Sequence, residues 1–230
     1  MPPIHLPPKG GGGGGGGGGG SPPPAFQAGT YTFRLVSYDI ANTRSRHEDT
    51  NFVSLGLVLN GGTPQTQQQS MGDENNGTFQ VTAHLAPILV DKPDAKVVFN
   101  YTIVNAGHAT PSDVVKTLQS TTTTLLNQGA AWAGTTVGSV LGTALAGPIG
   151  TAIGALVAWL GGKALGFLFA DCDGPVAAEQ VAFTGQDLWH LTSASATHVF
   201  AKTTHHPGTD SASGCGSNSD YTTHWTVTRS

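Results

Sequence analysis

The feature that most constrains this chain is a long segment without charge. No Asp, Glu, Lys, Arg or His occurs between Thr117 and Gly162. Small residues recur there and just beyond with a spacing of four, which keeps them on roughly one face of a helix. We call this set the glycine comb, and it consists of Gly134, Gly138, Gly142, Ala146, Gly150, Gly154, Ala158, Gly162 and Gly166. Such a stripe lets a second backbone approach closely, as it does where helices associate in lipid.

The residues before the comb are typical of a helix start. Ser112 can cap the helix, and Asp113 favours the positive end of the helix dipole. Val114, Leu118, Leu125 and Leu126 then begin an apolar helical stripe. We therefore expect a first helix from about residue 112, in which the four threonines 121–124 are an unusual start for a membrane span.

A break divides the uncharged segment into two arms. Gly147-Pro148 ends the first helix near Ala146, because proline suits the first turn of a new helix and not the interior of an old one. A second helix of roughly 23 residues, to about Ala170, would measure about 34 Å, enough to cross a hydrocarbon core. The sequence thus predicts a helical hairpin at about 112–170, with Trp132 and Trp159 on its two arms.

The glycine comb has two interpretations. The hairpin resembles the apolar hairpin of colicin-type pore-forming domains in outline, and glycine-zipper channel segments in its spacing. That resemblance, which covers about 50 residues, implies insertion or assembly in lipid. Because the turn interrupts the helical face, the comb is better described as two stripes, 134–146 and 150–166, that can face each other. Packing of the hairpin on itself, or on the rest of the protein, accounts for the same glycines without a membrane.

The flanking regions predict β structure. Apolar and polar residues alternate in eight stretches, the pattern of half-buried strands. These are 30–38, 52–59, 78–85, 96–104, 178–183, 188–191, 198–202 and 221–228. We expect an α+β protein in which an antiparallel β-sandwich, residues 30–230, carries the hairpin between its fourth and fifth strands. Residues 1–29, with an unbroken glycine run flanked by prolines, predict a disordered tail.

Composition excludes some functions. The net charge of −4 gives no electrostatic footprint for nucleic acid. No phosphate-binding loop, dinucleotide fingerprint or nucleophile elbow is present, so we expect neither catalysis nor a cofactor. The N-terminus lacks the layout of a signal peptide. All nine histidines lie outside 117–162, so an acid-induced reversal of net charge is conceivable.

The remaining candidate residues are cysteines, acids and histidines. Cys172 and Cys215 lie in polar loops and predict one disulfide, which favours a secreted or cell-surface location; two buried free thiols are the alternative. If they pair, Asp171, Asp173, Asp210 and Asp220 come together and could hold calcium, although solvated loop acids or turn caps are the simpler interpretation. Glu48 and Asp49 precede a strand. No zinc pattern is present, and we expect the histidines His190, His198, His205, His206 and His224 to be exposed or half-buried.

Two functions follow from these features. The first is a membrane-interacting protein of toxin or effector type, in which the hairpin leaves the sandwich and inserts or forms pores in a lipid bilayer. The second is a module without membrane activity. In it the hairpins pack within or between subunits of a homo-oligomer, and the sandwich loops bind a ligand such as a glycan. Neither the target membrane nor the ligand follows from the sequence.

Overall fold

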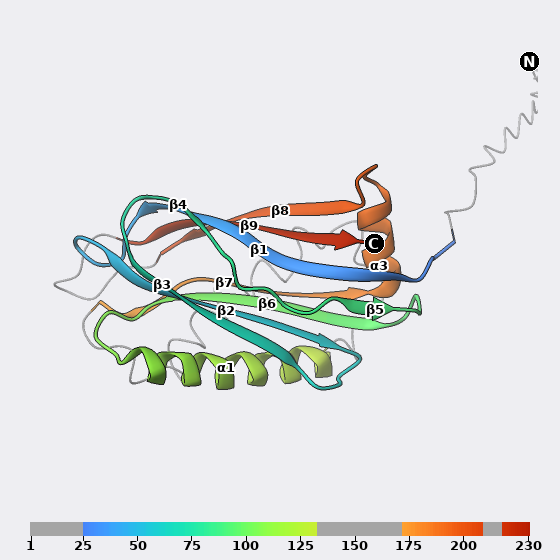
Figure 1. Ribbon diagram of the computed structural model, residues 1–230, viewed down its shortest axis with the longest axis horizontal. Helices are drawn as coiled ribbons and strands as arrows, with labels where there is room; N and C mark the ends of the chain where they lie inside the picture. The colour runs from blue at the N-terminus through green and yellow to red at the C-terminus, as the bar shows by residue number, and fades with distance from the viewer. Residues whose placement is uncertain (1–24, 133–171, 209–217) are drawn as a thin grey trace, which may run out of the picture.

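Residues 25–132, 172–208 and 218–230 are described by the computed structural model, and they form two antiparallel sheets with two helices (Figure 1). One sheet has the order β4–β1–β9–β8, with β5 also paired to β1; its strands are β1 (Gly29–Asn42), β4 (Gly77–Gln80), β5 (Ile88–Val90), β8 (Val199–Pro207) and β9 (Asp220–Arg229). The other sheet has the order β3–β2–β6–β7; its strands are β2 (Asp49–Leu59), β3 (Gln65–Glu74), β6 (Lys96–Asn105) and β7 (Gly174–Thr184). The helices are α1 (Pro111–Trp132) and α3 (Gly185–Ser193).

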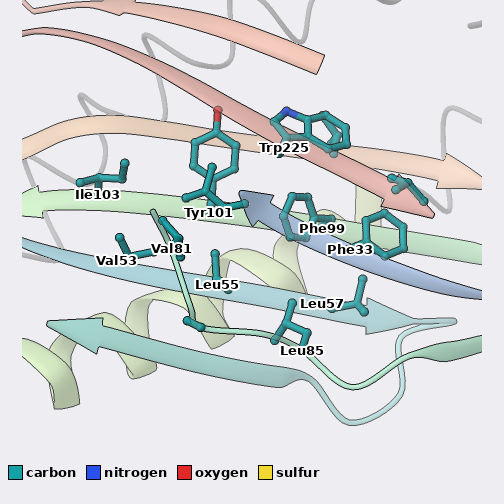
Figure 2. Packing of buried hydrophobic residues seen from close by; sticks show 14 of the residues in the cluster. Phe33, Val53, Leu55, Leu57, Val81, Leu85, Phe99, Tyr101, Ile103 and Trp225 are labelled. Carbon is teal, nitrogen blue, oxygen red and sulfur yellow. The ribbon is translucent and has the colours of Figure 1, made fainter. Parts of the chain in front are cut away.

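The main core lies between the two sheets. Period-two alternation sends every second side chain of the long strands inward, as the sequence predicted. Aromatic rings from both sheets meet there: Phe99 of β6 lies 5.3 Å from Phe33 of β1 and 5.6 Å from Trp225 of β9, measured between ring centroids. Figure 2 shows these rings beside the aliphatic side chains of β2. The strong alternation in β1, β2, β6 and β9 is thus explained by a shared interior.

The strand count before the inserted segment differs from the prediction. The structure has β3 and β5 in addition, so the insertion follows the sixth strand rather than the fourth. β3 has the sequence QTQQQSMGDE and is half-exposed at the edge of its sheet, beside β2. Its glutamines give no apolar alternation, and β5 has three residues. Both strands therefore lack the pattern by which strands are recognised.

The prediction of a strand at 188–191 is wrong, because these residues lie in α3. Thr184 caps this helix by accepting a hydrogen bond from the amide of Asp187, and the Asp187 side chain accepts one from the Thr184 amide, a reciprocal capping box. Leu188 and Trp189 are buried. Four residues are too short to separate helix from strand by periodicity, whereas the capping residues Thr184 and Asp187 just before them mark the helix start.

The start of α1 confirms a helix at the expected place but not its cap. The helix begins at Pro111, so Thr110 and not Ser112 occupies the capping position. The Thr110 carbonyl accepts from the Val114 amide at 3.1 Å, and the Thr110 hydroxyl donates to Asp113. Proline is favoured at the first helical position because its missing N–H is not needed there. Residues 133–171, which hold the rest of the predicted hairpin, and residues 1–24 of the predicted tail lie outside the described residues.

Candidate functional site: helix α1 and its seat

Helix α1 lies along the outer face of the four-stranded sheet (Figure 1). The predicted apolar stripe faces the sheet, since Val114, Leu118, Leu125 and Leu126 are each 4% exposed or less. Two apolar clusters join helix and sheet. One contains Phe52, Val104, Ala106, Val114, Leu118, Leu125 and Ala178, and the other contains Val58, Val98 and Leu126. The described part of the predicted hairpin, α1, is therefore packed on the two-sheet body.

The centre of this seat is polar. The hydroxyls of Ser54 on β2 and Thr122 on α1 are 2.7 Å apart, and the Gln68 side-chain amide donates to Ser54 at 3.3 Å. Asn100 on β6 is 1% exposed, yet within the described part of the chain neither of its amide atoms has a hydrogen-bond partner. The Oε1 atom of Gln180 on β7 is also buried without a hydrogen-bond partner among the described residues. We call Ser54, Asn100, Thr122 and Gln180 the polar seam.

Two glycines allow the helix to sit close to the sheet. A Cβ at Gly56 would lie 2.3 Å from Asn100 Oδ1 and 2.6 Å from Thr122 Cγ2. A Cβ at Gly129 of α1 would lie 2.5 Å from Gln180 Nε2 and 2.9 Å from Val98 Cγ1. Sequence reasoning missed both positions. Gly129 is not in the register of the comb, and Gly56 interrupts an otherwise apolar strand, which is the signal for a close backbone approach.

The register of the comb continues into the seat of α1. Steps of four backwards from Gly134 pass through residue 130 and then reach Leu126, Thr122, Leu118 and Val114. These last four are at most 1% exposed and face the sheet. In the described part of the helix, this register packs against the sheet, together with the neighbouring register that contains Leu125 and Gly129. The comb residues Gly134, Gly138, Gly142, Gly150, Gly154, Gly162 and Gly166, and Trp159, lie outside the described residues, and Trp132 is the last residue of α1.

The middle of α1 is a weak helix former. Four threonines at 121–124 are β-branched, which lowers helix propensity. The hydroxyls of Thr123 and Thr124 donate back to the carbonyls of Gln119 and Ser120 at 2.9 and 3.0 Å, a local bond that slightly destabilises a helix. The contacts with the sheet therefore contribute most of what keeps this segment helical.

Both ends of the inserted segment are fastened at one end of the sheets. Asp173, 2% exposed, follows the insertion and accepts hydrogen bonds from the amides of Gly107 and His108 at 3.0 and 3.1 Å. The His108 ring nitrogen Nδ1 lies 3.1 Å from the same carboxylate. We call this arrangement the Asp173 clasp. Asp173 thus has a structural role in joining the two chain segments, and protonation of His108 would add charge attraction to the clasp.

The loop between β1 and β2 holds the same region. Asp49 is buried and accepts from the amides of Arg44 and Ser45, both at 2.7 Å. Arg44 in turn donates through Nε to the Cys172 carbonyl at 2.9 Å. Burial lowers the pKa of Arg44, and the charges of Asp49 and Asp173 oppose that shift. Asp49 and Asp173 therefore tie together the loop after β1, the chain before α1 and the chain before β7.

The predicted Cys172–Cys215 disulfide stays a prediction, because Cys215 lies outside the described residues. Its surroundings are compatible with it. Asn42 donates a hydrogen bond to the carbonyl of Asn218. Arg44, two residues further along the chain, donates to the carbonyl of Cys172. The chain near Cys215 and the chain at Cys172 are thus both attached to the end of β1.

The histidines do not gather into one site. On the outer face of the five-stranded sheet, His224 Nε2 lies 2.7 Å from Asp39, and His205 Nε2 lies 2.7 Å from Asp220. The bond from His224 lowers the pKa of Asp39, with a smaller contribution from Thr78. These are cross-strand pairs on an exposed surface. Within the described ranges, no group of three or more His, Cys, Asp or Glu residues is arranged to hold a metal ion.

A buried polar network crosses the main core. Glu179 of β7 pairs with Lys202 of β8 and accepts hydrogen bonds from Tyr101, Thr204 and Trp225. Beside it, His206 Nε2 lies 3.1 Å from the Tyr101 hydroxyl. Burial lowers the pKa of His206 to about 4, against the opposing charge of Glu179. The expectation of exposed or half-buried histidines is wrong for His206, because its position on β8 points inward.

Comparison with protein-family models, with curated proteins and with solved structures finds no match to this chain. Among the helices in the described ranges, none combines the length and apolar character that a membrane crossing requires. The features of the chain that bear on its function are therefore the seat of α1, the Asp173 clasp and the uncharged sequence that follows α1.

Proposed function

We propose that this protein interacts with membranes in the manner of a toxin or effector, and that the uncharged segment after α1 is the part that enters or assembles in lipid. The two sheets are the soluble carrier of that segment. The observation that carries the proposal is the way the segment is attached. Its ends are fastened by a well-bonded clasp at Asp173, whereas the helix that leads into it rests on a polar and incompletely bonded seam.

The sequence of the segment supports a lipid role. From Ala133 to Gly162 it has no charged side chain, and Lys163 and Asp171 are the two charges before the clasp. A helix in lipid needs internal satisfaction of its backbone groups and small residues where helices meet. The comb provides such residues at Gly138, Gly142, Gly150 and Gly154. Pore formation would follow from several copies meeting along these stripes.

Dye release from liposomes tests the proposal. We expect wild-type protein to release dye from anionic or neutral vesicles at some pH between 7 and 4. The double variant Gly138→Leu/Gly154→Leu should release much less, because leucine keeps the segment apolar while blocking close helix contact. The matched control is Ala196→Leu, a small-to-leucine change in the exposed turn between α3 and β8. Equal release by wild type and the double variant, or no release at any pH, would reject the proposal.

The second candidate function is an assembly module without membrane activity. The observation that favours it is the continuation of the comb register into the sheet-facing residues Leu118, Thr122 and Leu126 of α1. In this case the comb packs on the protein or on a second copy, and the loops of the sheets bind a ligand such as a glycan. Size measurement by light scattering in detergent-free buffer distinguishes the two: a closed homo-oligomer without vesicle binding supports assembly.

A disulfide between Cys172 and Cys215 would strengthen either function. It would fix the exit of the inserted segment to the chain before β9, next to the Asp173 clasp. In the loop-entropy description, a bridge closing a loop of roughly 44 residues contributes about 4 kcal/mol. Mass measurement after alkylation, with and without reductant, tests the pairing. Labelling of both thiols in the unreduced, unfolded protein would disprove it.

A further inference from the structure

We propose that α1 is a releasable cover, which leaves its seat as a unit while the Asp173 clasp and both sheets stay intact. Its biological use, exposure of the uncharged segment to lipid, rests on the proposed function. The release itself is a property of the fold and can be measured without a membrane. Three observations carry it: the unsatisfied polar seam under α1, the weak intrinsic helicity of α1, and the firm hydrogen bonding at its base.

The polar seam favours release because water can form hydrogen bonds with side-chain amide atoms that have no partner while α1 covers them. Neither amide atom of Asn100 has a partner in the described structure while α1 covers it. A buried amide without a hydrogen bond carries its full desolvation penalty, and that penalty disappears when the group meets water. Gln180 Oε1 gains in the same way. The Ser54–Thr122 bond is exchanged for bonds to water, at a small net loss.

The base does not share this weakness. Asp173 is 2% exposed and bonded to Gly107 and His108, and the Arg44 side chain ties the neighbouring Cys172 carbonyl to the loop before β2. The chain between this base and the first turn of α1 is short and consists of Ala109 and Thr110. Release therefore bends the chain at residues 109–110 and leaves the clasp in place.

The free helix has little reason to persist in water. The threonines 121–124 and Gly129 lower helix propensity inside α1. An isolated segment of 22 residues with this composition does not hold a helix without tertiary contacts. Undocking and loss of helix in water are thus coupled, which makes the event visible as amide hydrogen exchange.

Native-state hydrogen exchange of the full chain, read by mass spectrometry or NMR, tests the release. We expect amides of α1 to exchange through a local opening at least about 100-fold more populated than the opening that exposes the amides of β2 and β6. Asn100→Leu should slow exchange in α1 by about tenfold, because it removes the unsatisfied amide from the seat. Gln119→Lys, on the exposed side of α1, is the matched control and should leave exchange unchanged.

Two results would overturn the proposal. One is equal protection of α1 and of the sheet amides, which would mean that α1 leaves its seat only when the whole protein unfolds. The other is an Asn100→Leu variant whose α1 exchanges as fast as wild type while its melting temperature is unchanged. That result would show that the seam does not limit release. A variant that fails to fold is replaced by Gln180→Leu, which removes the second unpaired oxygen.

A cross-link separates this inference from the proposed function. Ser54→Cys and Thr122→Cys replace two hydroxyls 2.7 Å apart, so the pair can pin α1 to β2. The cross-linked protein should lose local opening in α1, and the single variants should not. If α1 opens locally in the wild type but no vesicles leak, the release of α1 is supported and the proposed membrane function is rejected. If the cross-linked protein leaks dye as fast as the single variants, release of α1 has no part in that role.

Discussion

The two faces of the four-stranded sheet are built differently. The inner face, toward the other sheet, carries large side chains from β2 and β6 such as Leu55, Phe99 and Tyr101, and all three are fully buried. The outer face, toward α1, carries smaller and more polar residues at the positions between them, among them Ser54, Gly56 and Asn100. Alternation along the same strands produces both faces.

The buried polar groups on the two faces also differ in their hydrogen bonding. On the inner side, Glu179 is bonded to side chains of three other strands, so its charge and its lone pairs are satisfied. On the outer side, Asn100 and the Oε1 atom of Gln180 lack partners among the described residues. The inner side also holds single buried atoms without a partner among the described residues, such as Asn51 Oδ1 and His206 Nδ1. The contrast therefore lies between the charged centre at Glu179, which is bonded on several sides, and the Asn100 amide, which has no bond at either atom. On this basis we expect the inner contact to persist and the outer contact to be the one that opens.

Loss of the inner network should have the largest effect. Glu179→Ala leaves Lys202 without its partner and removes the acceptor for Tyr101 and Trp225. We expect the free energy of unfolding to fall by about 3–5 kcal/mol, the range for breaking a buried ion pair. Urea denaturation followed by tryptophan fluorescence measures this. Glu179→Gln keeps an acceptor and should lose less; a loss below about 1 kcal/mol in Glu179→Ala would remove the contrast between the faces.

Acidification should act on the inner face through His206. The pKa of this residue is lowered from 6.5 to about 4 by burial. Between these values the unfolded chain binds a proton that the folded chain does not, so stability present at neutral pH is lost as pH falls. The loss approaches about 3 kcal/mol at pH 4, since one pKa unit is about 1.4 kcal/mol.

His206→Gln should flatten this part of the pH dependence. Glu74 acts in the opposite direction, because burial raises its pKa and the folded carboxyl takes up its proton at a higher pH than the unfolded one. Its contribution is present in both proteins and cancels in their difference. Thermal melts of wild type and variant at pH 7, 6, 5 and 4 provide the measurement. Parallel curves for the two proteins would rule out His206 as the titrating group.

The inner face was predictable from the sequence and the outer seat was not. Alternation in β1, β2, β6 and β9 is a local signal, and it correctly indicated two antiparallel sheets with a common interior. The seat of α1 depends on which polar residues of β2 and β6 meet which residues of a helix far along the chain. No local sequence pattern at Asn100 or at Thr122 indicates that the two residues lie close together. The alternation indicates that Asn100 faces outward, but not that a helix covers it.

Local patterns also explain the errors. The edge strand β3 was missed because its glutamines are half-exposed and need no apolar face. Residues 188–191 were assigned to a strand because a window of four apolar-rich residues has no resolvable period. The capping box formed by Thr184 and Asp187 is the sequence signal that would have corrected this. The Asp173 clasp joins residues 107–108 to residue 173 across the whole insertion, a separation that no local pattern encodes.

A cavity under α1 should lower stability by less than the changes on the inner face, and the loss should be confined to α1. Leu118 on α1 and Leu55 on β2 are both fully buried, which makes them a matched pair. Leu118→Ala should weaken docking by about 2 kcal/mol, at the low end for such changes because the seat can adjust. The loss should appear as faster exchange of α1 amides, with global stability nearly unchanged. Leu55→Ala should lower the global free energy of unfolding; an equal global loss in both variants would show that α1 belongs to the permanent core.

The smallest effect should come from the helix caps, and it sharpens the same comparison. Thr110 precedes α1 and Thr184 precedes α3, and each hydroxyl is bonded to the helix it starts. Replacement of either by Ala should cost about 1 kcal/mol. Because α3 packs Leu188 into the main core, Thr184→Ala should lower global stability by this amount. Thr110→Ala should instead leave the urea midpoint where it is and raise exchange in α1 by about fivefold. The two hydroxyls are bonded differently, because Thr184 accepts from the Asp187 amide whereas Thr110 donates to the Asp113 side chain. The comparison therefore rests on where each loss appears, globally for α3 or locally for α1, and not on its exact size.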